Sequence, residues 1–289
     1  MRAATMDPDP CSFPTECGMQ ITFIGGGNMA AALIGGLLAR GAAPASIRVV
    51  EPVATQREAL HVRFGVAAFE CASAQSLADV DLVVLAVKPQ QMREAVAPLQ
   101  PLLRDALVVS VAAGIRMSDL SRWLGGHQRI VRAMPNTPAL IGMGVTGLAA
   151  LPGTRPADRE TADRVLGAVG PTVWVDAEPL LDAVTAISGS GPAYAFLFME
   201  AMQDAALAIG LDARQARNLV LHTFAGAAQL ALRSDEDPAR LRERVTSRGG
   251  TTAAALAVME EGDLRGLVGR AIEAAHRRGM EMGDEFGEA

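Results

Sequence analysis

Short apolar runs alternate with longer amphipathic segments over the first 176 residues of the chain. Runs that are hydrophobic at nearly every position are typical of parallel strands covered on both faces. The predicted strands are Gln20 to Ile24, Ile47 to Val50, Asp81 to Val87, Leu107 to Val111, Arg129 to Met134, Val145 to Ala149 and Thr172 to Val175. The pattern therefore predicts an α/β fold, with an N-terminal Rossmann-like doubly wound sheet over residues 19–176.

After Asp176 the hydrophobic spacing becomes helical almost throughout. The segment Ala193 to Ile209 is apolar on nearly every side, so it predicts a buried helix, and a subunit interface is the expected place for it. The other predicted helices follow Asp212, follow Asp237, cover Ala253 to Glu261 and cover Asp263 to about Met282. Residues 177–289 are therefore expected to form an all-α C-terminal domain that binds substrate and dimerises.

A glycine motif directly follows the first predicted strand. The run from Gly25 to Ala30 has the G-x-G-x-x-A form of a dinucleotide-binding turn, in which glycines permit the turn and the next helix N-terminus binds the pyrophosphate. Glu51 ends the second predicted strand, where an acid hydrogen-bonds the ribose of NAD. Gln56 and Arg57 lie just beyond and can accommodate a 2′-phosphate, so both NADPH and NADH stay open. The predicted ligands are Ile24, Gly25, Gly26, Gly27, Asn28, Met29 and Glu51.

Further cofactor candidates follow later strands, because ligands of open α/β sheets bind beyond the carboxyl ends of strands. Lys88 is the only lysine among the 26 basic side chains of the chain, and it falls at such a position. Asn136 is predicted to hydrogen-bond the nicotinamide carboxamide, although a plain Asn-Thr turn explains it about as well. The other candidates are Ala86, Val87, Pro89, Ala112 and Ala113.

The stretch Val245 to Thr252 is predicted to be a loop that enters a helix. Its glycines allow backbone N–H groups to approach a ligand closely, and Thr251 or Thr252 is the expected N-cap. A helix N-terminus carries roughly half a positive charge and several unpaired N–H donors, so it can hold a small carboxylate. An ordinary capped turn is the alternative interpretation.

The composition argues against several kinds of partner. A formal net charge of −6, no basic stripe and 4% aromatic residues argue against nucleic-acid binding. No apolar run is long enough for a membrane span, and residues 1–18 resemble a flexible leader rather than a signal peptide. Three cysteines without a pairing or metal-ligand pattern fit a reducing cytoplasm.

Histidines and paired carboxylates give no separate site. The 4 histidines lack metal-ligand spacing, so no metal is expected. None of these histidines is assigned a catalytic role. Glu200 and Asp204 share a helix face, as do Glu178 and Asp182 if that segment is helical, and both pairs are interpreted as structural.

Six blocks of the sequence together resemble the pyrroline-5-carboxylate reductase family. They are Ile24-Gly25-Gly26-Gly27-Asn28-Met29, Ala86-Val87-Lys88-Pro89, Ser110-Val111-Ala112-Ala113-Gly114, the run from Arg132 to Ala139, the run from Asp182 to Tyr194, and the run from Val245 to Thr252. They follow the family's order and cover essentially the whole chain after the leader. The later blocks are far more specific than the glycine motif.

The resemblance implies that NAD(P)H reduces 1-pyrroline-5-carboxylate to L-proline, the last step of proline biosynthesis. It implies an intertwined homodimer through the C-terminal helices, often assembled into a larger ring. It places substrate on the glycine loop, with Glu178 nearby and with Ser247 and Thr252 as catalytic candidates. The substrate-binding candidates are Ser247, Gly249, Gly250, Thr251, Thr252 and Glu178. One departure is Arg248, where the family commonly has proline.

Two other classes of protein compete with this interpretation. A hydroxyacid dehydrogenase of similar build needs a lysine in its helical domain, and no lysine follows Lys88. Another imine reductase with a Rossmann and a helical domain is the related alternative. A non-catalytic NAD(P)-sensing protein needs no second ligand site, so the hydroxyl-rich loop argues against it.

Overall fold

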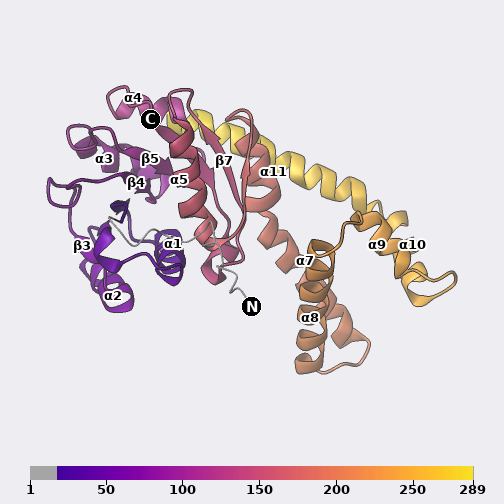
Figure 1. The fold of residues 1–289 in the computed structure, drawn as a ribbon. Coiled ribbons are helices and arrows are strands. Elements are labelled where there is room, and N and C mark those ends of the chain that lie inside the picture. The colour runs from indigo at the N-terminus through magenta and orange to yellow at the C-terminus, as the bar shows by residue number, and fades with distance from the viewer. Residues whose placement is uncertain (1–17, 289) are drawn as a thin grey trace, which may run out of the picture. The chain divides into compact units, whose positions relative to one another are not determined.

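The computed structural model describes residues 18–288, so the predicted leader lies outside the described residues except for Gly18. The described chain forms two compact units (Figure 1). The first comprises residues 18–189 together with residues 275–288, and the second is Ser190–Ala274. The sequence places a domain boundary after residue 176, and that boundary stays a prediction.

The first unit is built on one sheet. Its strands are β1 (Ile21–Ile24), β2 (Ile47–Val50), β3 (Ala67–Phe69), β4 (Leu82–Leu85), β5 (Leu107–Ser110), β6 (Ile130–Met134), β7 (Thr146–Ala150) and β8 (Thr172–Trp174). They form an eight-stranded sheet in the order β3-β2-β1-β4-β5-β6-β7-β8, and within it β6 and β7 alone pair antiparallel. Every predicted strand is present, and the predicted α/β doubly wound fold is confirmed. The short strand β3 was missed because two alanines and a phenylalanine give no recognisable apolar run.

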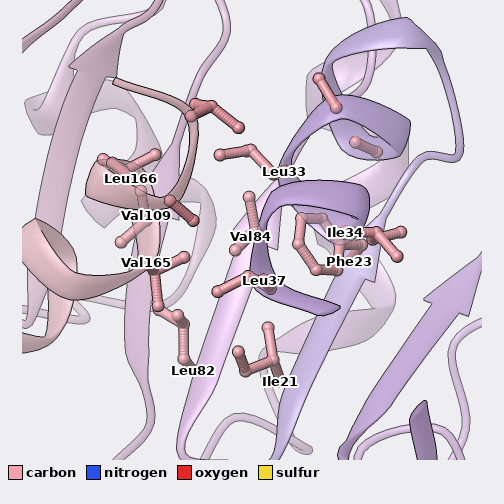
Figure 2. Packing of buried hydrophobic residues seen from close by; sticks show 14 of the residues in the cluster. Ile21, Phe23, Leu33, Ile34, Leu37, Leu82, Val84, Val109, Val165 and Leu166 are labelled. Carbon is pink, nitrogen blue, oxygen red and sulfur yellow. The ribbon is translucent and has the colours of Figure 1, made fainter. Parts of the chain in front are cut away.

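Helices connect the strands on both faces of this sheet. They are α1 (Asn28–Ala39), α2 (Ala54–Phe64), α3 (Met92–Val96), α4 (Met117–Trp123), α5 (Pro156–Leu166) and α6 (Leu180–Val184), the last continuing into a π-helical turn, Thr185–Gly189. Alternate residues of each strand point to opposite faces. Val84 therefore packs with Leu33 of α1 and Val165 of α5, as Figure 2 shows. Val83, its neighbour, belongs to the core on the other face with Met92 of α3.

The second unit is helical. It contains α7 (Gly191–Ala208), α8 (Ala213–Leu232), α9 (Pro238–Arg244), α10 (Thr251–Glu261) and the first part of α11 (Leu264–Glu288). The prediction of a helix that is apolar on most sides is correct for α7, yet none of its residues is buried within one chain. Phe196 is 63% exposed and Leu197 is 66% exposed. No helix in the described part of the chain is both long and apolar enough to cross a bilayer.

Helix α11 is longer than the sequence suggested. It continues past the predicted end at Met282 to Glu288, and its last part belongs to the first unit. Arg116 donates a hydrogen bond to Asp284 at 2.7 Å, and Arg122 donates to the carbonyl oxygen of Gly287 at 2.9 Å. These contacts with residues far apart in sequence stabilise the last residues of α11, whose helical conformation the local sequence does not predict.

A largely buried ion pair, in which the Arg129 side chain is 18% exposed and that of Asp158 5%, fixes α5 to the sheet. Arg129, just before β6, donates to Asp158 through Nε at 3.0 Å and also through a second guanidinium nitrogen. Asp158 also accepts the backbone N–H of Arg155 at 2.9 Å, which caps the start of α5. The hydrogen bond from Arg129 lowers the pKa of Asp158 from its usual value, although burial acts in the opposite direction. The folded state therefore favours the ionised carboxylate.

We expect Asp158→Asn to lower the free energy of unfolding at pH 7 by about 2 to 3 kcal/mol, since it removes one partner of a buried charged pair. Because the folded-state pKa is lowered, this contribution is complete above a pH of about 4 and is lost as the pH falls through the folded-state value. The difference between variant and wild type should therefore shrink in acid. Urea titrations followed by the fluorescence of Trp123 and Trp174, both in the first unit, measure it.

Asp105→Asn is the matched control, because Asp105 pairs with the same arginine at 3.0 Å but is 70% exposed. Exposed pairs contribute little, so its effect should be much smaller. Equal losses for the two variants at pH 7 would contradict the role given to the buried carboxylate.

Candidate active site

The carboxyl ends of β2, β1, β4 and β5 meet at one edge of the sheet because these strands are parallel. Ile24 pairs with Val50 on one side and with Leu85 on the other, and Leu85 pairs with Ser110. The chain order reverses between β1 and β4, which is where open α/β sheets bind ligands. The fold therefore brings the cofactor candidates to one edge, although they are spread from residue 24 to residue 136.

At the three consecutive glycines Gly25, Gly26 and Gly27, a Cβ atom would meet different surroundings. Gly25 has φ +97°, and a Cβ there would lie 2.8 Å from the carbonyl oxygen of Ala86. A Cβ at Gly26 would lie 2.6 Å from Leu60 Cδ1. Gly27 is the N-cap of α1, no side chain caps this helix, and a Cβ there would meet nothing within 4 Å. The first two glycines let the turn pack, and the third leaves open space over unpaired N–H groups, which suits a pyrophosphate.

The remaining candidates of this edge occupy consecutive turns. Ile24 ends β1, Asn28 and Met29 begin α1, Ala86, Val87, Lys88 and Pro89 follow β4, and Ala112 and Ala113 follow β5. The side chain of Lys88 is exposed. Gly114, next along the chain, has φ +76°, and a Cβ there would lie 2.9 Å from Phe286 and 3.2 Å from Met282. The end of α11 thus packs behind the loop that follows β5.

Glu51 is buried, and both of its carboxylate oxygens are occupied by backbone donors. Oε2 accepts the N–H of Gly26 at 2.9 Å, and Oε1 accepts the N–H of Val53 at 2.9 Å. Arg57 Nη1 donates to the carbonyl oxygens of Glu51 at 2.8 Å and Pro52 at 2.7 Å. Glu51 therefore joins the glycine turn to the start of α2, and each carboxylate oxygen keeps a lone pair for a ribose hydroxyl.

Asn136 lies after β6 and holds two segments together. Its Nδ2 donates to the carbonyl oxygen of Ser188 at 3.1 Å, and its Oδ1 accepts the N–H of Val145 at 2.9 Å. One amide hydrogen and one lone pair remain. The structure thus gives this buried side chain a structural role, and its predicted contact with nicotinamide stays a prediction.

Glu178 belongs to a charge cluster whose arginine was missed by sequence reasoning. Its Oε1 accepts the N–H of Met117, the first residue of α4, at 2.7 Å and a hydrogen bond from Arg132 at 3.2 Å. Arg132 also donates to Asp182 at 3.3 Å. Among the charged residues of this cluster, only Arg132 had been given no role. A charged residue inside an apolar strand does not reveal its partner from sequence. The structural interpretation of Glu178 and Asp182 agrees with these contacts.

The predicted substrate loop joins α9 to α10 in the second unit. Gly249 has φ +73°, and the N–H of Gly250 donates to the carbonyl oxygen of Ser247 at 3.1 Å. The prediction that Thr251 or Thr252 caps the helix is wrong. Gly250 is the N-cap, with extended φ −83° and ψ 173°, and Thr251 is already the first helical residue. A glycine N-cap contributes no side-chain acceptor, so the first-turn N–H groups of α10 are uncapped.

The hydroxyls of Ser247, Thr251 and Thr252 make no hydrogen bond to any residue that the structure describes. Thr246, directly before them, donates instead to the carbonyl oxygen of Arg242 at 2.6 Å. Threonines inside helices commonly bond the carbonyl four residues back. Residues four back from the first turn of α10 are not helical, so that bond is not available to the two threonines. Ser247 and Thr251 are exposed and Thr252 is half-buried, so these hydroxyls flank the uncapped start of α10 without a partner among the described residues.

Comparison with known proteins agrees with this geometry. Residues 178–282 match the model of pyrroline-5-carboxylate reductase dimerisation, and residues 20–114 match the model of coenzyme F420-dependent NADP oxidoreductase. A pyrroline-5-carboxylate reductase of Pseudomonas aeruginosa is 47% identical over 270 residues, which cover 93% of this chain and 98% of the relative. The one of Escherichia coli is 40% identical and covers 86% of this chain and 93% of its own length. This chain belongs to the pyrroline-5-carboxylate reductase family.

Solved pyrroline-5-carboxylate reductases share the fold. The one from Coxiella burnetii has a TM-score of 0.87 at 40% identity and covers 91% of this chain and 98% of its own. The one from Plasmodium falciparum, solved with NADP bound, has a TM-score of 0.80 at 28% identity and covers 92% of this chain and 98% of its own. This chain is therefore an NAD(P)H-dependent oxidoreductase of proline biosynthesis. The sequence-based assignment of family, activity and cofactor type is confirmed over the hydroxyacid-dehydrogenase and sensor alternatives.

We expect Gly27→Ala to weaken NADH binding at least about tenfold, or about 1.4 kcal/mol, because a methyl group would fill the space left for the pyrophosphate. The fold should not suffer, since Gly27 has φ −70° and no near neighbour. Fluorescence titration with NADH and thermal unfolding measure the two effects. Gly167→Ala, which also meets nothing within 4 Å but follows α5, is the control. Wild-type affinity in Gly27→Ala would show that the cofactor does not pass over this residue.

Proposed function

We propose that the chain reduces 1-pyrroline-5-carboxylate to L-proline with the cofactor along the carboxyl edge of the sheet and the substrate carboxylate on the α9–α10 loop. The observation that carries the second part is the uncapped start of α10 beside three hydroxyls without partners. A helix N-terminus binds an anion through its N–H groups and its dipole, so no dedicated cation is required.

The reaction needs little acid–base machinery from the protein. A bound NAD(P)H would supply a hydride for the imine carbon, the C=N π electron pair would pass to nitrogen, and a proton would complete the amine. A protonated imine is already a good hydride acceptor, so catalysis is mainly orientation of the ring against the nicotinamide. We assign Thr252 a hydrogen bond to the ring nitrogen. Ser247, Gly249, Gly250 and Thr251 are assigned to the carboxylate.

The cofactor assignment follows the strand ends. The pyrophosphate is assigned to the N–H groups at Gly27, Asn28 and Met29, and the adenine ribose to Glu51. The turns after β4 and β5, which carry Ala86 to Pro89 and Ala112 to Ala113, are assigned to the nicotinamide half. Asn136 supports this region by joining the segment after β6 to Ser188. Glu178 supports it by fixing the start of α4.

The helical region is proposed to form a homodimer. Support comes from the match of residues 178–282 to the family's dimerisation model and from the exposed apolar side chains of α7. Burying Phe196 and Leu197 would stabilise the assembled state. Assembly of dimers into a larger ring rests on the family resemblance. A cytoplasmic location rests on the cysteine pattern and the absence of a signal-peptide pattern.

We expect Thr252→Val to lower kcat/KM for the imine by about 1 to 2 kcal/mol, the value of one hydrogen bond to a partly charged group. Steady-state kinetics with the imine at fixed NADH measure it. Thr246→Val is the matched control, because that hydroxyl already donates to the carbonyl oxygen of Arg242 in α9, and its kcat/KM should stay near the wild-type value. Wild-type turnover by Thr252→Val would remove Thr252 from the reaction.

We expect Lys88→Met to weaken NAD(P)H binding at least about threefold and leave the melting temperature unchanged, since an exposed cation beside an anionic cofactor contributes roughly 0.5 to 1 kcal/mol. Lys88→Arg keeps the charge and should restore most of the affinity. Titration with NADH and with NADPH measures both variants. Unchanged affinity in Lys88→Met would mean that the lysine does not meet the cofactor.

A further inference from the structure

We infer that this enzyme prefers NADH to NADPH, and that Glu51 determines the preference. The inference rests on the proposed cofactor site at the carboxyl edge of the sheet. The sequence left the choice open, because Glu51 favours a free ribose whereas Gln56 and Arg57 can accommodate a 2′-phosphate. The contacts of these three side chains in the folded chain decide between them.

The carboxylate of Glu51 already accepts the backbone N–H groups that could otherwise bind a 2′-phosphate. It accepts the N–H of Gly26 at 2.9 Å and that of Val53, the N-cap of α2, at 2.9 Å. Pro52, between them, has no N–H to offer. The negatively charged Glu51 carboxylate thus lies at the start of α2. It can accept a hydrogen bond from a ribose hydroxyl, whereas it would repel a phosphate.

Glu51 is also unable to swing away easily. It is 8% exposed, and its Cβ and Cγ lie 3.3 Å from the position that a Cβ of Gly26 would take. Turning the side chain outward would leave the buried N–H of Gly26 without its present acceptor, which is costly, and would free the N–H of Val53, a residue that is 50% exposed and can bond water instead. The negative charge is therefore a fixed part of the glycine turn.

The Arg57 guanidinium already makes contacts within the turn after β2 and near Glu70. Its Nη1 gives both hydrogens to carbonyl oxygens, those of Glu51 at 2.8 Å and Pro52 at 2.7 Å. Its Nη2 lies 3.8 Å from a carboxylate oxygen of Glu70. The guanidinium therefore closes the turn after β2 through Nη1, and the exposed Glu70 offsets part of its charge. Gln56 is exposed and carries no charge, so it does not offset Glu51.

The test compares kcat/KM for NADH and NADPH in the wild-type enzyme at saturating imine. We expect NADH to be favoured by about tenfold or more, because a phosphate would lie beside an ionised carboxylate. Glu51→Gln removes the charge and should bring the ratio close to one. Glu51→Asp keeps the charge and should keep the preference. Equal or better use of NADPH by the wild type overturns the inference, whether or not either variant folds.

Two further measurements separate this inference from the proposed reaction. Calorimetric binding of 5′-AMP and of 2′,5′-ADP to the full chain needs no turnover, and 5′-AMP should bind more tightly. Tighter 2′,5′-ADP binding overturns the preference, whereas failure to reduce the imine with either cofactor overturns the proposed function instead. Arg57→Ala should change kcat/KM for both cofactors by the same factor. A loss confined to NADPH would make Arg57 a phosphate ligand and contradict the inference.

Discussion

The account depends on helix N-termini that no side chain caps. Helix α1 begins after Gly27 and α10 begins after Gly250, and neither N-cap supplies an acceptor for the first-turn N–H groups. At two other helices a side chain accepts an N–H group at the start. Asp212 caps α8 from its own N-cap position, and Glu178 accepts the N–H of Met117 at the start of α4. A glycine N-cap leaves unpaired donors and a positive dipole end, which is what a pyrophosphate or a small carboxylate requires.

Buried charges hold the surrounding turns in place. Glu51 connects the glycine turn to α2, and Arg132 connects β6 to the acids on either side of the start of α6. The end of α11 packs behind the loop after β5, at Gly114. Rigid support of this kind matters for a reaction whose catalysis is mainly orientation, since small displacements of the ring or the nicotinamide lower the rate. Glu51 and Glu178 thus position backbone groups, and in the proposed site backbone N–H groups bind the anions.

The sequence predicted the fold well because strand signals here are strong. Continuous apolar runs such as Asp81 to Val87 have few other interpretations, and the glycine motif fixed the connection of β1 to α1. Sequence-based prediction failed where backbone conformation or contacts between distant residues determine the local structure. The N-cap of α10 was misplaced because threonine and glycine compete for that position, and backbone conformation, which sequence does not reveal, selected Gly250. The extension of α11 to residue 288 depends on Arg116 and Arg122, which are more than 150 residues earlier.

A crystal structure with NAD⁺ and L-proline bound tests the central claim most directly, because it locates both anions at once. The account predicts the pyrophosphate on the N–H groups that follow Gly27 and the proline carboxylate on those that follow Gly250, with Thr252 toward the ring nitrogen. A proline carboxylate held by an arginine side chain away from residues 247–252, with the start of α10 empty, would contradict it.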